Sequence, residues 1–260
     1  MPFSADATVY TLVNNNSSAT LDLGTSAGLN SWVVDGQNQE NQQWYWFRIG
    51  PSGPQMDLTA ITTSPFVTIN SASQLTALYT NGGNYGVQLQ YTLAGQAPGS
   101  GNSGLTESVR VFNYNASSTL DLHLFLYSDF TLRDGGYTSD QYVQEGTLSG
   151  VSTSTQTLGN FGVGTNNFTA ITPATLFEVE PYSQTRTSLT TVNGYNLNGT
   201  TSGGPGHITW AMQWDKTINP SSSFNLSLLD NMTNVPEPSV VALALVGLSI
   251  GFFKKNKKRA

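Results

Sequence analysis

Cysteine is absent from this chain of 260 residues. Its absence excludes disulfide bonds, a thiol nucleophile and any metal site built on Cys. Charged residues make up only 10% of the sequence, far below the roughly one quarter of a typical soluble domain. The low charge predicts a neutral, hydrogen-bonding surface, which suits an exported β-protein better than a cytosolic enzyme.

Positive charge is scarce over most of the chain. Residues 1–234 contain five basic residues against fifteen acids, so their formal charge is about −10. Such a body lacks the basic patch that neutralises phosphates, and this argues against a nucleic-acid partner. The other five basic residues stand together at the C-terminus: Lys254, Lys255, Lys257, Lys258 and Arg259.

A sustained helical period is missing before residue 240, and alternation of apolar and polar residues recurs instead. The clearest strands are expected within residues 85–93, 120–127, 208–214 and 224–228. Further strands are expected within residues 8–13, 20–23, 31–34, 43–49, 66–69, 108–114 and 176–180. Gly, Asn and Pro turns separate them. The pattern predicts an all-β, antiparallel β-sandwich or jelly-roll-like body over residues 1–234.

Motifs for catalysis are weak. The stretch from Gly24 to Gly28 matches the G-x-S-x-G pattern of hydrolases, but a second strand follows it where a nucleophile elbow needs a helix. The two histidines, His123 and His207, lack metal-ligand spacing, so we expect surface or loop roles. Glu178 and Glu180 share one face of a strand and cannot flank a sugar as a glycosidase pair does. We therefore predict no catalytic residue, no metal and no cofactor.

Four acids lie around one glycine turn, and carboxylates near such a turn can ligate Ca²⁺. They are Asp129, Asp134, Asp140 and Glu145. No EF-hand pattern accompanies them, so ordinary turn and surface roles are the favoured interpretation.

Aromatic residues gather at Trp44-Tyr45-Trp46-Phe47. In a strand, Trp44 and Trp46 point to one side. Core packing is the favoured interpretation, because aromatic side chains bury a large area. The alternative is an exposed platform on which Trp44 and Trp46 stack against sugar rings.

The tail, residues 235–260, has three parts. Pro236, Glu237, Pro238 and Ser239 come first, the uncharged run Val240–Phe253 follows, and the basic cluster ends the chain. As a helix the run would cover about 21 Å, less than the ~30 Å hydrocarbon core. We expect a temporary membrane anchor with the basic cluster as the cytoplasmic stop and the body outside.

This layout resembles the PEP-CTERM sorting signal of bacterial exported proteins. The resemblance implies export, transient insertion in the lipid bilayer, and removal of the tail by a membrane-embedded transpeptidase of the exosortase type. Proteins with this signal belong mostly to Gram-negative bacteria that make exopolysaccharide or biofilm, and some ice-binding proteins end similarly. An Ala-x-Ala sequence at residues 5–7 is similar to the end of a signal peptide, so the gene is expected to start further upstream.

The leading prediction is a non-catalytic β-sandwich of the cell surface or extracellular matrix. A secreted protein that binds or hydrolyses polysaccharide is the first alternative. Ice binding is a minor one, because Thr59, Thr62, Thr63 and Thr68 form no regular array.

Overall fold

The computed structural model describes residues 8–132, 141–158 and 164–234. The Ala-x-Ala sequence, the sorting motif, Val240–Phe253, the basic cluster and the acids Asp134 and Asp140 all lie outside the described residues. Within the described ranges, no helix has both the length and the apolar character needed to cross a bilayer.

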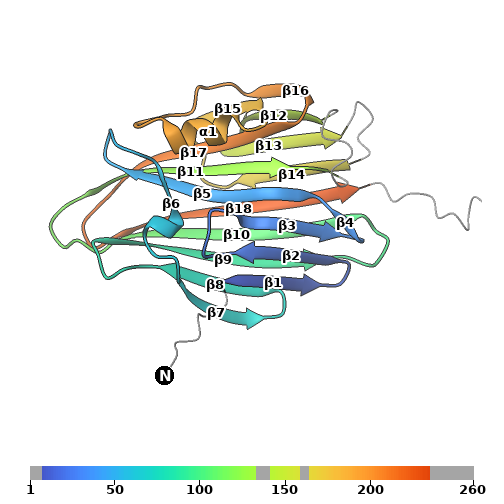
Figure 1. Ribbon diagram of the computed structural model, residues 1–260, viewed down its shortest axis with the longest axis horizontal. Helices are drawn as coiled ribbons and strands as arrows, with labels where there is room; N and C mark the ends of the chain where they lie inside the picture. The colour runs from blue at the N-terminus through green and yellow to red at the C-terminus, as the bar shows by residue number, and fades with distance from the viewer. Residues whose placement is uncertain (1–7, 133–140, 159–163, 235–260) are drawn as a thin grey trace, which may run out of the picture.

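Two nine-stranded sheets form the body, stacked as a sandwich with their strands running in similar directions (Figure 1). Sheet A has the order β1 (Val9–Asn14), β2 (Ser17–Asp22), β3 (Gly28–Val34), β5 (Glu40–Ile49), β11 (Leu120–Phe130), β17 (Ile208–Ile218) and β15 (Leu176–Pro181). In addition, β4 (Gln37–Asn38) pairs with β3, and β6 (Met56–Asp57) pairs with β5.

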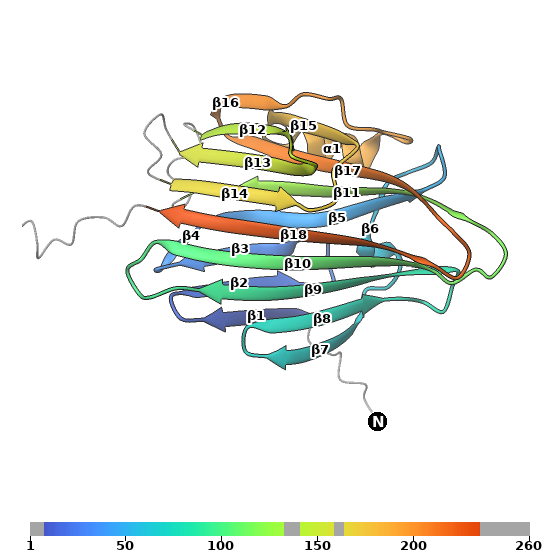
Figure 2. The same ribbon diagram turned by 180° about the vertical axis from the view of Figure 1, so that it is seen from behind.

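Sheet B has the order β16 (Ser202–Gly206), β12 (Gln141–Leu148), β13 (Val151–Leu158), β14 (Gly164–Ala170), β18 (Ser223–Asn234), β10 (Asn102–Asn113), β9 (Tyr85–Gly95), β8 (Gln74–Tyr79) and β7 (Phe66–Ser71). Figure 2 views the molecule from behind, with β18 and β10 crossing its middle. The helical elements are the 3₁₀ turn η1 (Leu58–Ala60) and the helix α1 (Gln184–Thr191).

The predicted all-β sandwich is confirmed, and the sandwich is larger than the eight strands of a jelly roll. All eleven predicted strand regions overlap strands of the structure. The strands that the sequence did not reveal include β8, β12, β13 and β14. Three of these, β12, β13 and β14, carry polar residues or Gly on most positions, so their alternation of apolar and polar residues is faint.

The core lies between the sheets. All five tryptophans are buried: Trp32, Trp44, Trp46, Trp210 and Trp214. The leucines of β11 and the rings of Tyr45 and Phe47 on β5 face the space between the sheets. There, Tyr45 donates a hydrogen bond to Glu107 of sheet B at 2.6 Å. Each fully buried large apolar side chain stabilises the fold by about 1.5–3 kcal/mol. The interior thus holds the two sheets together.

Candidate functional site

An aspartate and a histidine meet on the outer side of sheet A, at the end of the sheet where β11 finishes. Asp129 lies at the end of β11, and His207 stands between β16 and β17. The distance between Asp129 Oδ1 and His207 Nε2 is 2.7 Å. The side chain of Asp129 is 5% exposed and that of His207 is 25% exposed. Asp129 is therefore buried, whereas His207 is partly exposed to solvent.

An aromatic ring covers one side of the histidine. Tyr182, which follows β15, stacks on the His207 ring with a centroid distance of 4.1 Å and an interplanar angle of 12°. The backbone N–H of Tyr182 also donates to the His207 carbonyl at 2.7 Å. Tyr182 is 49% exposed. We call Asp129, Tyr182 and His207 together the His207 site.

Local irregularity of the sheet positions the aspartate. Asp129 is the last residue of β11 in regular register with β5, because the register shifts between Asp129 and Phe130. Irregularities of this kind end the regular pairing of strands beside sites. Below Asp129 on the same strand, Tyr127 is fully buried and meets the Trp46 ring edge-on at 5.9 Å. These two packed rings give the His207 site a rigid floor.

Burial raises the pKa of Asp129 above its ordinary value, and the hydrogen bond and the charge of His207 partly oppose that rise. Arg186, on α1, adds a smaller opposing contribution. An ionised Asp129 accepts a hydrogen bond from Nε2–H of His207. In a neutral imidazole this leaves Nδ1 as an acceptor. The pair is thus able to accept from a ligand hydroxyl group and, in chemical terms, to move a proton.

The second histidine also pairs with an aspartate, but within a structural network. His123 on β11 lies directly across from Asp215 on β17, with Nδ1 2.6 Å from Oδ1. Gln213 donates to Asp215 at 2.7 Å and to Asn196 at 2.9 Å. The buried Arg48 donates to the carbonyl of Tyr195 at 2.6 Å. These bonds fasten the segment around residues 195–198 across the outer face of sheet A.

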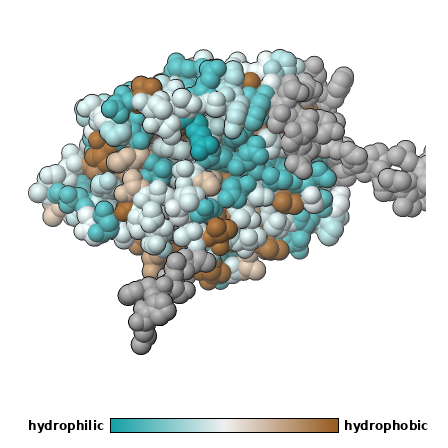
Figure 3. Space-filling model, in the orientation of Figure 1, coloured by the Kyte–Doolittle hydropathy of each residue, from teal (hydrophilic) through white to brown (hydrophobic). Residues whose placement is uncertain are grey.

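Figure 3 shows the face of the molecule that carries α1, in the orientation of Figure 1. Hydrophilic side chains cover much of it, and the apolar ones form small separate patches. This face is therefore polar and dominated by hydrogen-bonding groups rather than by an apolar docking patch.

Trp44 and Trp46 are 0% and 2% exposed. Trp44 packs edge-on against Tyr79 of sheet B at 6.1 Å. This burial is what the core-packing interpretation expects, and neither indole offers an open face to a sugar ring.

The other sequence candidates are dispersed. Glu145 is buried on β12, which belongs to sheet B, whereas the Asp129–His207 pair lies on sheet A. Glu178 is buried and accepts a hydrogen bond from Asn198 N at 2.9 Å, whereas Glu180 accepts from the Asn198 amide at 2.7 Å. Gly28 begins β3, so a strand follows the G-x-S-x-G stretch, as predicted. Among the described residues, no three His, Cys, Asp or Glu side chains are grouped as a metal site.

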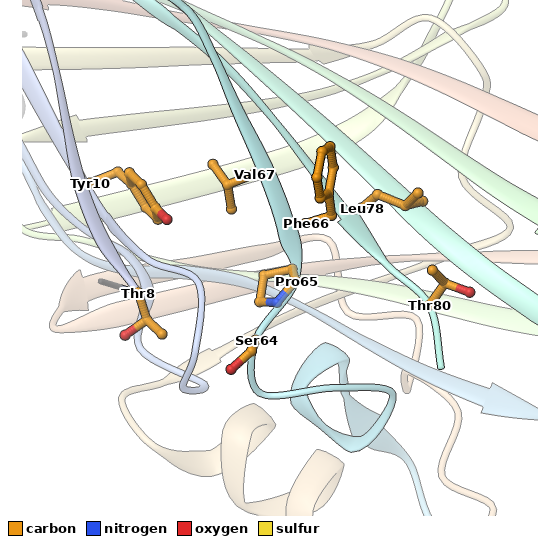
Figure 4. A pocket seen from close by; sticks show the side chains of 8 residues that line it. All are labelled: Thr8, Tyr10, Ser64, Pro65, Phe66, Val67, Leu78 and Thr80. Atoms are coloured by element: carbon orange, nitrogen blue, oxygen red, sulfur yellow. The ribbon is translucent and has the colours of Figure 1, made fainter. Parts of the chain in front are cut away.

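A separate concavity of about 260 Å³ lies at the open edge of the sandwich, between β1 of sheet A and β7–β8 of sheet B. Its lining, seen in Figure 4, is Thr8, Tyr10, Ser64, Pro65, Phe66, Val67, Leu78 and Thr80. Phe66 is 72% exposed. This groove offers apolar contact and hydroxyl groups, but none of its lining residues is a carboxylate or a histidine.

The sequence did not point to the His207 site, because its members are far apart in the chain. Asp129 and His207 are separated by 78 positions, and Tyr182 lies between them. A usable signal existed in their positions. Asp129 and Tyr182 come just after predicted strands and His207 comes just before one, and β11, β17 and β15 are neighbours in the sheet.

Comparisons with known proteins identify the fold. No protein-family model matches the chain, and neither does any curated protein sequence. Among solved structures, a bacterial glucoamylase complexed with acarbose is similar with a TM-score of 0.62 and 11% identity. That match covers 93% of this chain and 34% of the glucoamylase, so the chain spans about a third of that protein.

A galactose mutarotase-like protein from Lactobacillus casei matches with a TM-score of 0.52 and 12% identity, over 86% of this chain and 99% of that protein. A polysaccharide lyase matches with a TM-score of 0.50 and 11% identity, over 89% of this chain and 33% of the lyase. At these identities the likeness shows a shared two-sheet fold. That fold occurs both as a whole protein and as a part of larger ones.

Proposed function

We propose that this chain is an exported β-sandwich protein of the cell surface or extracellular matrix, which binds a saccharide at the His207 site without transforming it. One observation carries the proposal. Tyr182 presents a half-exposed ring beside a histidine that a buried aspartate holds in place. Saccharides are recognised by such a combination, because an aromatic ring packs on the apolar face of the sugar while polar groups bond its hydroxyls.

The solved structures of similar fold support this choice of ligand. They include a glucoamylase, a galactose mutarotase-like protein and a polysaccharide lyase. Saccharides are the shared theme of those names. The low identities mean that the residues of the present site, rather than the fold, must supply the specificity.

The tail supplies the proposed location. Pro236, Glu237, Pro238 and Ser239 would be recognised by an exosortase-type transpeptidase while Val240–Phe253 is in the bilayer. Mass spectrometry of the protein released from the cell surface should find a C-terminus that lacks residues 254–259. An intact basic cluster on the surface form would contradict processing.

Acid–base catalysis on a sugar is the second candidate. It is favoured by the 2.7 Å Asp129–His207 pair, since a positioned His can transfer protons near neutral pH. Turnover of a bound saccharide that disappears in His207→Gln but persists in His123→Gln would establish it. Binding without turnover supports the leading proposal.

A glycan array with the full chain, followed by titration of the best oligosaccharide, tests the binding function. Tyr182→Ala should weaken binding about tenfold, equivalent to about 1.4 kcal/mol, because the stacking surface is lost. Tyr182→Phe keeps the ring and should bind nearly as well as the wild type. Equal affinity of the wild type and Tyr182→Ala, or the absence of any binding, would contradict the proposal.

A further inference from the structure

The outer face of sheet B is almost uncharged. In the described strands of this sheet, the only carboxylates are Glu107, Glu145 and Asp230, and each points into the sandwich with at most 5% exposure. Arg110 is the one charged side chain on the outer side of those strands. Carboxylates normally stay in water because their burial is costly. The sheet therefore carries its acids inside and a neutral surface outside.

Hydroxyl and amide side chains form rows across this face, perpendicular to the strands. Thr233 of β18, Thr165 of β14 and Thr157 of β13 are register neighbours. In the same way, Asn231 lies beside Asn167, and Thr106 lies beside Thr92. Neighbouring strands are about 4.8 Å apart, so each row presents polar groups at a short, regular interval.

Most of these groups have no partner within the part of the chain that the structure describes. No side-chain hydrogen bond is made there by Thr106, Ser108, Asn225, Ser227, Asn231 and Thr233. Their exposed donors and acceptors remain available for a ligand that brings many hydroxyl groups.

Three shallow hollows lie on the same face, and residues of β18 help to line two of them. The first, of about 280 Å³, is lined by Ser223 together with residues of β10. The second, of about 430 Å³, includes Asn231 and Thr233. The threonine row from Thr233 leads to the third, of about 460 Å³, which includes Thr157 and Tyr142. Two hollows thus lie at the two ends of β18, and the threonine row connects the second of them to the third.

An aromatic anchor stands at the first hollow. The rings of Phe112 and Tyr114 are stacked, with centroids 5.5 Å apart and planes at 13°. The guanidinium carbon of Arg110 lies 4.6 Å from the Phe112 centroid, and its Nε donates to Ser223 at 3.0 Å. Tyr114 is 46% exposed. This arrangement fixes a ring that is ready to pack on the flat side of a sugar.

We propose that the outer face of sheet B binds a long, uncharged polysaccharide along the path from Tyr114 past Asn231 to Tyr142. An uncharged polymer fits because the described strands of this sheet present one cation and no carboxylate on their outer side. A chain of sugars fits because its hydroxyl groups can form hydrogen bonds with the rows of Thr, Ser, Asn and Gln. These rows are spread over about the length of a strand. This site is distinct from the His207 site, which lies on the other sheet.

The proposal is tested by co-sedimentation of the full chain with the uncharged polymers cellulose, chitin and curdlan. Titration with alginate, an acidic polymer, provides the comparison. Asn231→Glu places a charge on the path and Tyr114→Ala removes the anchor, so each should reduce affinity for the uncharged polymer that binds at least tenfold. Thr11→Glu, an exposed threonine of β1 on sheet A, is the matched control and should bind like the wild type. Affinity should also remain the same as NaCl is raised, because screening acts only on charge.

Tyr182→Ala separates this site from the His207 site, since it should leave the binding of the long polymer intact while weakening short saccharides. Wild-type affinity in both Asn231→Glu and Tyr114→Ala would overturn the sheet B site without touching the His207 proposal. Preference for alginate, or thermal hysteresis of ice growth without polysaccharide binding, would overturn it as well.

Discussion

Carboxylic acids inside the sandwich are the most unusual feature at the scale of single residues. Glu40, Glu107, Glu145 and Asp230 are buried, and burial raises the pKa of each of them. For Glu107 burial raises the pKa from 4.5 to about 7, although the hydrogen bond from Tyr45 opposes the rise. At mildly acidic pH this acid is therefore neutral in the folded protein.

The raised pKa of Glu107 makes stability depend on pH. Below pH 4.5 the group is protonated in both states. Between pH 4.5 and about 7 the unfolded chain releases the proton that the folded protein keeps, so the free energy of unfolding falls as pH rises. The loss from this one group approaches about 3 kcal/mol. Urea unfolding of the wild type should show greater stability at pH 5 than at pH 8.

Glu107→Gln removes this titration and keeps the shape of the side chain. The difference between pH 5 and pH 8 should shrink by up to about 3 kcal/mol. Asp121→Asn, an amide substitution at an exposed acid, is the matched control and should retain the full difference. If Glu107→Gln unfolds with the same pH dependence as the wild type, Glu107 is not the source of the difference in stability between pH 5 and pH 8.

Among single residues, the sequence revealed the chemistry of exposed polar positions poorly. His123 lies within a strand that alternation predicted, but its partner Asp215 is 92 positions away in the sequence. Strand alternation tells which side a residue faces and not which strand comes to lie beside it. Sequence analysis was more informative for the aromatic run that begins at Trp44. Four large aromatic rings in one strand bury a large area, and this favours packing in the core.

At the scale of secondary-structure elements, β3 and β5 meet through a short parallel contact in an otherwise antiparallel sheet. Gly28 begins β3 with φ of +59°, and a Cβ there would lie 2.3 Å from Cε3 of Trp44 and 2.5 Å from the carbonyl oxygen of Gln43. The glycine is therefore required both for its backbone conformation and for the close packing of Trp44.

Gly28→Ala should lower the free energy of unfolding by about 3 kcal/mol. The backbone strain of a positive φ and the steric clash of the new Cβ with Trp44 both contribute. Gly36→Ala is the matched control. Gly36 also has a positive φ, +82°, but a Cβ there meets nothing within 4 Å. That variant should lose only about 1 kcal/mol. Urea denaturation compares the two, and equal losses would show that the contact with Trp44 is not decisive.

For elements, the sequence predicted strands wherever leucine or aromatic residues alternate with polar ones, as in β11 and β17. It gave little sign of β13 and β14, whose inner positions include Ser154, Gln156 and Asn166. These buried polar residues erase the contrast between the two faces. The interior of sheet B near its acids is polar, and hydropathy alone cannot find such strands.

At the scale of the whole molecule, the sandwich has two polar outer faces that carry different kinds of side chain. Sheet A carries two histidine–aspartate pairs, and sheet B carries rows of uncharged groups. The sequence predicted the sandwich and the neutral character of the surface. It could not predict how the groups divide between the faces, because that division depends on the order of strands within each sheet.

A crystal structure of the full chain with a bound oligosaccharide, chosen by the glycan array, would show directly whether the His207 site binds a saccharide. We expect a sugar ring in van der Waals contact with Tyr182, at about 4 Å, with a hydroxyl group bonded to His207. A sugar bound elsewhere with Tyr182 left open to solvent would contradict the assignment of the His207 site.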